Sequence, residues 1–401
     1  MKLLLTLLLA GLTMVGPLAI DTYLPSFPAI AQTFDASPMA IQQTLSLFLF
    51  TFASMMLFYG TLSDSFGRRP VILWSLVLYI LASLGGALAG SFGFLLGARV
   101  LQGFASGAGS VISRAIVQDR FEGLAAQKIL GNIMMVFGLA PAIAPVLGGW
   151  LQVSFGWRSI FWFLTGFGVL MWIAVWRWLP ESLPVEKRHP LHLGAIARNY
   201  WMVLKHRQFL LLSVALGAAF GGFALYIGSA AYFIMHILHL PETAFAWLFI
   251  PLISGHVLGA SISGKLAQRL SQGALIRLSF VLMAVAAAAN IGYNWFFPAQ
   301  VPWAVAPLFL YSFALALAMP PLTLVGMNLF PNHSGLASSM QSFIQMLLFA
   351  LVSGLVAPLL FDSALHLAFG LAGCLVASYA AYVLAHPARP RPQGQGAGVT
   401  S

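Results

Sequence analysis

Long apolar stretches separated by short polar breaks recur along the whole chain of 401 residues. A helix that crosses a bilayer needs about 20 mostly apolar residues, and a run without alternation indicates a helix rather than a barrel strand. Runs of suitable length fall at residues 3–24, 40–62, 71–90, 91–113, 129–151, 159–179, 209–235, 244–263, 275–297, 302–328, 336–360 and 363–385. The sequence therefore predicts an all-α membrane protein with 12 transmembrane helices.

The composition excludes a soluble globule. Hydrophobic residues make up 60% of the chain and charged residues only 7%, whereas soluble domains are about a quarter charged. The formal net charge is +10, but the basic residues lie between apolar runs and form no stripe with interleaved aromatic residues. We therefore expect membrane lipid, and no nucleic acid, as a partner. The single cysteine, Cys374, lies in an apolar run and is interpreted as a packing residue.

The lysine and arginine residues indicate the orientation, because positively charged loops stay in the cytoplasm. With a cytoplasmic N-terminus, seventeen of the 19 Lys and Arg residues fall in inner loops or at inner helix ends. Arg158 then falls in an outer loop, and Arg99 falls inside the fourth run. An even number of helices with both termini in the cytoplasm is predicted.

The longest polar interval, from Leu179 to Gln208, separates the first six apolar runs from the last six. A weak repeat supports this division, because the segment GTLSD that begins at Gly60 has a counterpart in GKLAQ, which begins at Gly264. Parallel repeats of this size are typical of transporters. We expect two six-helix pseudo-symmetric halves, a linker and a disordered tail, with these bounds: N-terminal bundle 1–180, cytoplasmic linker 181–207, C-terminal bundle 208–386 and cytoplasmic tail 387–401.

The segment GTLSDSFGRRP connects the second and third runs. Gly60 and Gly67 allow a tight turn, Asp64 can cap a helix end, and Arg68 and Arg69 can pair with it or with phospholipid headgroups. This segment resembles the cytoplasmic-loop signature of the major facilitator superfamily.

Two further runs resemble the same superfamily. In the fourth run, an arginine followed three residues later by Gln-Gly matches the family's fourth-helix pattern, in Arg99, Gln102 and Gly103. The fifth run resembles the family's antiporter pattern of prolines and glycines, although Ala144 replaces the usual glycine before the second proline. The antiporter motif comprises Gly138, Pro141, Pro145, Gly148 and Gly149. The small residues allow close helix packing, and the prolines bend a helix by removing backbone donors.

Together with AIDTYLPSFP, SDSFGRRP and RAIVQDRF, these motifs make the chain similar to the Bcr/CflA branch of drug exporters, mainly over its N-terminal half. The resemblance implies a major facilitator fold in a bacterial inner membrane and proton-driven efflux of compounds such as bicyclomycin, chloramphenicol-type drugs or sulfonamides. It also implies a cytoplasmic latch in which Asp64, Arg68 and Asp119 are joined. We expect a monomer that is not an enzyme and that needs no metal or cofactor besides the proton as coupling ion.

Charged residues within the apolar runs are rare, and they are the candidates for coupling. Of the nine acidic residues only Asp21 lies in the body of a span, and Arg99 is the only base well inside one. A charge at mid-bilayer costs about 3 kcal/mol on insertion scales, so such a residue tends to face a cavity and to have a role. We predict that Asp21 carries the proton and that Arg99 tunes its proton affinity; a purely structural ion pair is the alternative.

The C-terminal half offers only neutral groups within its spans. Candidate substrate-cavity residues are Tyr23, Tyr226, Tyr232, Tyr311 and Asn328, each of which could instead be an interface anchor or a packing residue. The histidines near the seventh and eighth runs show no metal-ligand spacing, and we interpret them as interfacial or packing residues. They are His236, His239 and His256.

Three other functions are weighed. An exporter of a natural metabolite, such as a nucleoside or amino-acid derivative, fits the same fold, because the fold does not fix the substrate. A membrane enzyme needs a clustered acid, base or metal site, and a passive channel needs rings of like charge or carbonyl filters. The predicted spans show neither. A single carboxylate near an arginine favours neutral or zwitterionic substrates over dications.

Overall fold

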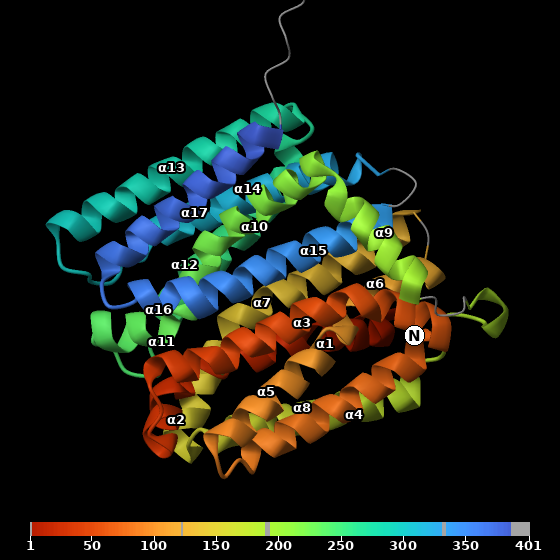
Figure 1. Ribbon diagram of the computed structural model, residues 1–401. Coiled ribbons are helices and arrows are strands. Elements are labelled where there is room, and N and C mark those ends of the chain that lie inside the picture. Colours follow the sequence, from red (N-terminus) through yellow and green to blue (C-terminus); the bar gives the residue numbers. More distant parts are fainter. Residues whose placement is uncertain (1, 122, 189–192, 331–333, 386–401) are drawn as a thin grey trace, which may run out of the picture.

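The computed structural model describes residues 2–121, 123–188, 193–330 and 334–385, and every regular element in them is helical (Figure 1). Its α-helices are α1 Lys2–Asp21, α2 Phe27–Phe34, α3 Pro38–Phe66, α4 Arg68–Ala87, α5 Phe92–Ser106, α6 Ala108–Arg120, α7 Gly123–Phe155, α8 Arg158–Trp178, α9 Leu193–Lys205, α10 Arg207–Gly228, α11 Ala230–Tyr232, α12 Ala246–Leu266, α13 Gln272–Phe296, α14 Ala306–Met327, α15 Ser334–Leu351, α16 Ala357–Leu360 and α17 Ala364–Ala385. The described residues also contain two 3-10 turns, η1 Leu24–Ser26 and η2 Val185–Lys187, and two π-helical turns, η3 Phe233–Ile237 and η5 Val352–Val356.

Most helix ends lie within a few residues of the ends of the predicted apolar runs. In the described residues, eleven helical stretches are long and apolar enough to cross a membrane, and α7 contributes a shorter apolar stretch, Leu139–Phe155. The fourth run is longer than predicted, because α5 and α6 together extend it to Arg120. The protein is thus an all-helical, multi-pass membrane protein. The count of twelve spans stays a prediction.

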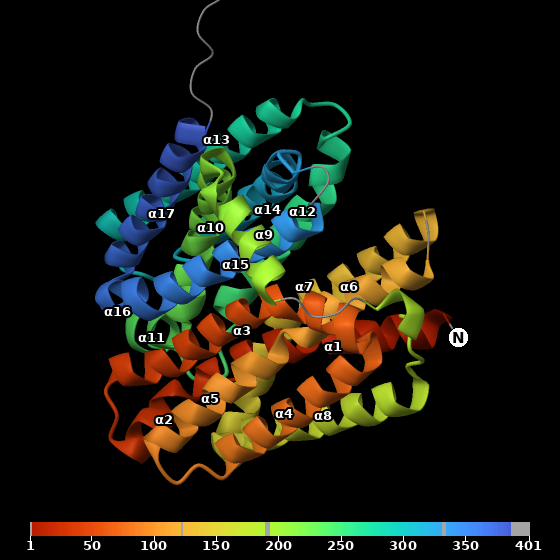
Figure 2. The same cartoon turned by 45° about the vertical axis from the view of Figure 1, so that its right-hand side comes forward.

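Helices α1–α8 gather in one group and α10–α17 in another (Figures 1 and 2). Between the groups, α3 packs along α15 and α7 packs along α12. Within them, α1 packs against α7, α4 against α8 and α10 against α17. Buried apolar side chains continue from one group into the other, so the two share a core.

The linker predicted at 181–207 contains a helix, α9, that was not expected from the sequence. Tyr200, Val203 and Leu204 lie on one face of it, at helical spacing, and pack into an apolar cluster with α10 and α15. The Tyr200 hydroxyl also donates a hydrogen bond to the Leu57 carbonyl of α3, 2.8 Å away. The predicted tail, residues 387–401, lies outside the described residues.

Candidate functional site

Asp21 is the last residue of α1 and is buried, with 3% of the residue exposed. Its carboxylate makes no hydrogen bond or ion pair with any residue that the structure describes. An ionised carboxylate in such a place has lost its water without gaining a partner. Such a group stays a candidate for binding and releasing a proton.

Arg99 of α5 is fully buried and, unlike Asp21, has partners for part of its side chain, whereas its Nε and Nη2 have no hydrogen-bond partner among the described residues. Its Nη1 donates hydrogen bonds to the Ala19 carbonyl at 3.0 Å and to Oε1 of Gln102. The guanidinium carbon lies 4.2 Å from the centre of the Tyr23 ring and 4.3 Å from that of Phe48. Cation–π contacts of this kind stabilise a desolvated guanidinium.

Ala19 and Tyr23 lie two residues before and two residues after Asp21. Arg99 therefore holds the end of α1 on both sides of the acidic residue. No ion pair joins Asp21 to Arg99, because the guanidinium is directed at the Ala19 carbonyl and at Gln102, one turn away on its own helix. The two candidate coupling residues share one segment of α1 without contacting each other through their charges.

The other residues of the fourth-helix motif lie at the same place. Gln102 accepts from Arg99 and donates through Nε2 to the Ser83 hydroxyl of α4, 2.8 Å away. A side chain at Gly103 would collide with the Phe48 carbonyl of α3. The motif thus packs α5 tightly against α3 while it positions Arg99 over α1.

The antiporter motif of α7 also reaches the segment that carries Asp21. A side chain at Gly148 would collide with the Thr22 carbonyl, and one at Gly149 would collide with the Glu242 carbonyl in the loop before α12. Its glycines thus let α7 touch both the end of α1 and the C-terminal group. Both prolines, Pro141 and Pro145, lie inside the helix. The packing around the motif's first glycine, Gly138, lies outside the described side chains.

The predicted latch residues Asp64, Arg68 and Asp119 are joined. Arg68 donates through Nη1 to Asp64 and to the Ser63 hydroxyl, and through Nε to Asp119 at 3.1 Å. The Arg68 side chain is 9% exposed, the Asp119 side chain is 20% exposed and the Asp64 side chain is 45% exposed. The Ser182 hydroxyl donates to Asp119 at 2.7 Å. The cluster ties the turn between α3 and α4 to the end of α6.

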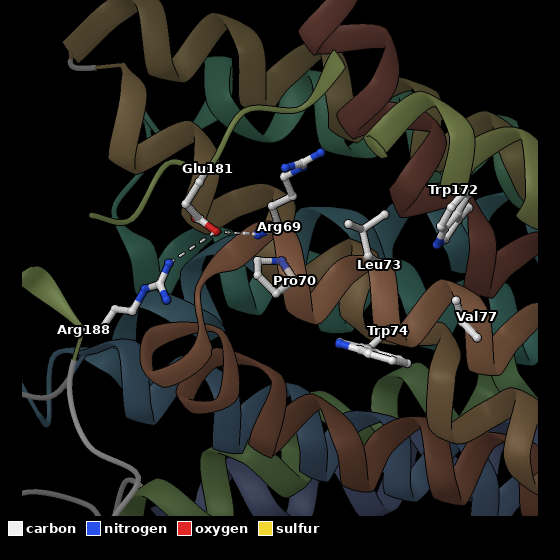
Figure 3. Close-up of a pocket in the computed structure, with 8 residues that line it drawn as sticks. All are labelled: Arg69, Pro70, Leu73, Trp74, Val77, Trp172, Glu181 and Arg188. Atoms are coloured by element: carbon white, nitrogen blue, oxygen red, sulfur yellow. Dashed lines mark hydrogen bonds and ion pairs between the residues drawn. The ribbon is translucent and has the colours of Figure 1, made fainter. Parts of the chain in front are cut away.

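Glu181 is part of this cluster, although its role was not predicted from the sequence. Its carboxylate accepts hydrogen bonds from the backbone amides of Arg68 and Arg69, at 3.0 and 3.2 Å, where α4 begins (Figure 3). A helix N-terminus favours such an anion. Gly67, with φ of +100°, makes the turn, and a side chain there would meet Glu181. A side chain at Gly60 would meet open space. The side chain of Arg69 donates to the Trp176 carbonyl and forms no ion pair with the acidic residues of the latch.

Three of the predicted cavity tyrosines are buried with engaged hydroxyls. Tyr23 pairs with the Thr44 hydroxyl at 2.9 Å, Tyr226 accepts from Asn290 at 2.7 Å, and Tyr311 donates to the Ala219 carbonyl at 2.8 Å. These bonds fit the packing alternative.

The remaining two lie near helix ends. Tyr232 stacks between His236 and Phe361, with ring centres 4.3 and 4.4 Å away. Asn328 is exposed at the end of α14. His256 of α12 lies against the Phe223 ring, and its Nδ1 has no partner among the described residues. A role for any of these residues in substrate binding stays a prediction.

A contact between the two helix groups was not predicted at all; we call it the outer seam. Gln42 of α3 donates to the carbonyl and the hydroxyl of Ser353, at 2.7 and 3.0 Å, and Gln43 donates to the Gly354 carbonyl at 3.2 Å. Both acceptors belong to the π-helical turn η5, and π turns often mark functional positions. A side chain at Gly354 would collide with Ser46. The only signal in the sequence is a pair of glutamines at the start of an apolar run.

Comparison with known proteins agrees with these features. Residues 9–353 match the Major Facilitator Superfamily. The bicyclomycin resistance protein homolog of Haemophilus influenzae is 29% identical over 384 residues, 94% of each chain. Multidrug resistance protein D of Escherichia coli is 27% identical over 341 residues, 85% of each chain. The E. coli xylose transporter XylE, in a partially occluded inward-open conformation, has the same fold, with a TM-score of 0.70 at 17% identity over 98% of this chain and 99% of that one.

The relatives confirm the resemblance to the Bcr/CflA branch that the motifs predict. The family match covers far more than half of the chain. The chain belongs to the major facilitator superfamily.

Proposed function

We propose that the protein is a proton-coupled antiporter that exports small amphiphilic, neutral or zwitterionic drug-like compounds across the bacterial inner membrane. Relatives that match most of the chain are named for resistance to bicyclomycin and to multiple drugs. Asp21 is the one buried carboxylate among the described residues, which offers little to a dication.

The proposed transporter acts as a monomer of twelve spans in two six-helix halves, with both termini in the cytoplasm. The two helix groups and the distribution of basic residues support this arrangement. Reporter fusions test it directly. A reporter in the loop from Glu181 to Arg207 should be cytoplasmic and one near Glu242 periplasmic; the reverse at either position would overturn the orientation.

The single observation that carries the mechanism is the buried and unpaired carboxylate of Asp21. A proton taken up from the periplasm neutralises it, and substrate binding displaces that proton, either by sharing the cavity or by shifting the equilibrium between outward-open and inward-open states. Arg99 positions the segment that carries Asp21.

Alternating access requires contacts that exist in only one of the two states. The outer seam is suited to this role, because it joins the two helix groups through neutral hydrogen bonds at the end proposed to be periplasmic. The latch lies within the N-terminal group at the opposite end and biases its conformation.

An efflux screen in drug-sensitive cells tests the function. Cells that express the protein should become resistant to a subset of chemically distinct compounds, bicyclomycin and chloramphenicol included, and should accumulate less of them until a protonophore collapses the proton gradient. A chain that confers no resistance, while its expression releases a natural metabolite into the medium, would be a metabolite exporter.

A further inference from the structure

A second contact joins the two helix groups at the end proposed to be periplasmic, where α7 packs along α12. Glu242 lies in the loop between η3 and α12. Its backbone carbonyl lies so close to Gly149 of α7 that any side chain at Gly149 would collide with it. We call the contact of Glu242 with Gly149 and Gln152 the α7 seam. It brings a carboxylate to the boundary between the groups, whereas the outer seam is made of neutral side chains.

Gln152 of α7 is held in place from the N-terminal group. Its Oε1 accepts a hydrogen bond from the Ser26 hydroxyl at 3.0 Å, and Ser26 is fully buried in η1. Because Ser26 occupies the amide oxygen, the amide nitrogen is free to donate on its other side. The hydrogen-bond partner there is the Glu242 carboxylate. A carboxylate of the C-terminal group is thus bonded to a side chain that the N-terminal group orients.

The α7 seam is continuous with the segment that carries Asp21. Gly148 packs against the Thr22 carbonyl, directly after Asp21, while the adjacent Gly149 packs against Glu242. Ser26 follows Asp21 by five positions in the same segment. Close-packed elements transmit displacements, because they leave no empty space to absorb them. Opening of the α7 seam therefore disturbs the packing beside Asp21.

The surroundings of Glu242 differ between the closed and the open seam. In the closed seam its side chain is partly buried and bonded to Gln152, whereas an open seam would expose the carboxylate to water. Burial raises the pKa of the Glu242 carboxyl above its ordinary value, and the bond from Gln152 lowers it by less. Proton binding therefore stabilises the closed seam. This stabilisation is fully present below the ordinary pKa of glutamate and is lost as the pH rises through the raised pKa.

No basic side chain pairs with Glu242 in the described part of the chain. The neighbouring elements carry few titratable groups, and those that lie nearest in the chain or at the same end are Asp21, Asp35, His236, His239 and His256. His236 stacks on the Tyr232 ring, and His256 lies against the Phe223 ring. The lysines of α7 and α12, Lys128 and Lys265, belong to the opposite ends of these helices.

We propose that Glu242 is a second proton-binding residue of the export cycle. Its carboxylate takes a proton from the periplasm as the α7 seam closes over it, and returns that proton to the periplasm as the seam opens. This proton is not carried across the membrane; it makes closing of the periplasmic side depend on periplasmic pH. Acid holds the seam closed and favours the inward-open state, in which Asp21 can release its own proton. The inference rests on the proposed antiport.

Distances between two spin labels test the site in the Asp21→Asn chain, in which the proposed coupling residue no longer titrates. Gly90→Cys and Gln300→Cys, combined with Cys374→Ser, place one label in an exposed loop of each helix group at the periplasmic end. Lowering the pH from about 8 to about 5 should increase the population with the short distance severalfold, because protonation of Glu242 favours the closed seam.

Two variants assign this response to the α7 seam. Glu242→Gln imitates the protonated form, so the short distance should dominate at both pH values. Gln152→Leu removes the bond that favours the ionised carboxylate, so the transition should move to higher pH.

Asp362→Asn is the matched control. Asp362 lies in another loop of the C-terminal group at the same end, its side chain is 66% exposed, and it pairs with His366. This variant should respond to pH as the Asp21→Asn chain does. A distance that does not change with pH in that chain, or a response that survives Glu242→Gln, would overturn the proposal; the second result would assign the response to a histidine. Substrate-induced proton release at neutral pH tests Asp21 separately, so the two proposals can fail independently.

Discussion

The two helix groups keep polar side chains out of lipid in different ways. Helices α1–α8 bury a guanidinium at Arg99 and a carboxylate at Asp21. In the described residues of α10–α17, the buried polar side chains are Ser, Asn, Gln and Tyr, with neutral bonds such as that from Asn290 to Tyr226. The loop repeat shows the same contrast, because Gln268 stands where the N-terminal group has Asp64.

This contrast indicates a division of labour. Neutral hydrogen bonds keep their strength when the pH changes, whereas a buried carboxylate changes its charge. We therefore predict that the N-terminal group responds to the proton through Asp21 and that the C-terminal group is the part against which it moves.

The largest effect is expected from Arg99→Ala compared with Asn290→Ala. Removing Arg99 leaves a cavity between two aromatic rings and removes the donor to Oε1 of Gln102, which should cost about 3 kcal/mol. Removing the Asn290 side chain breaks one neutral bond to Tyr226 and one from Asn294, whose amide keeps its bond to the backbone carbonyl of residue 290, for about 1.5 kcal/mol. Thermal unfolding in detergent should give a clearly lower midpoint for Arg99→Ala. Equal unfolding midpoints of the two variants would show that buried polar contacts contribute equally to the stability of the two helix groups.

The next effect concerns the outer seam. Gln42→Leu removes two bonds to Ser353, worth about 2 kcal/mol, and should shift the balance toward the outward-open state by roughly 30-fold. A cysteine at position 46, introduced as Ser46→Cys with Cys374→Ser, lies against Gly354 while the seam is closed.

An impermeant maleimide applied from the periplasmic side should label this cysteine faster in the Gln42→Leu background. Gln43→Leu removes a single bond of 3.2 Å and serves as the graded comparison, with a smaller increase. Unchanged labelling in both backgrounds would remove the seam from the mechanism.

A smaller effect is expected at the latch. Asp64 is 45% exposed, so Asp64→Asn should bias the conformation by only about 1 kcal/mol, lowering transport while leaving membrane insertion nearly intact. Asp362→Asn is the matched control in the C-terminal group, because Asp362 also pairs with a basic residue four positions later, His366. Transport assays in vesicles should show a loss for Asp64→Asn alone. Equal losses would make the latch an ordinary surface pair.

The smallest effect is expected from Tyr232→Phe. The ring stack with His236 and Phe361 is retained, so export should stay within about twofold of the wild type. Tyr23→Phe removes the bond to Thr44 beside Arg99 and should reduce export more. A larger loss for Tyr232→Phe in drug-resistance assays would make its hydroxyl a substrate contact.

The sequence predicted the helices well, because bilayer thickness imposes the length of each apolar run and Lys and Arg mark the breaks. It also predicted the partners of Arg68, through a motif. The role of Glu181 was not predicted, because Glu181 lies more than a hundred positions from Arg68 in the chain and only the tertiary structure brings it to the start of α4. The π-helical turn η5 was not predicted, because no residue type marks such a turn in a sequence.

The sequence does not specify which side chains meet inside the bundle. It places Asp21 and Arg99 within apolar runs, but rotation about the helix axis decides what each side chain contacts. The guanidinium of Arg99 meets the Ala19 carbonyl and the Tyr23 ring, on either side of Asp21. The same reasoning explains the tyrosines, whose hydroxyls found partners within the bundle that no spacing in the sequence specifies.

Proton coupling at Asp21 can be measured as substrate-induced proton release from purified protein. We predict that adding a transported drug to the wild-type chain in weakly buffered detergent solution releases protons, and that Asp21→Asn, which imitates the protonated form, releases none while still binding the drug. Asp35→Asn makes the same chemical change outside the spans, at a position with φ of +48° that asparagine tolerates, and should release protons as the wild type does. Undiminished release from Asp21→Asn would contradict the account and make His256, or else His236, the next candidate for the coupling residue.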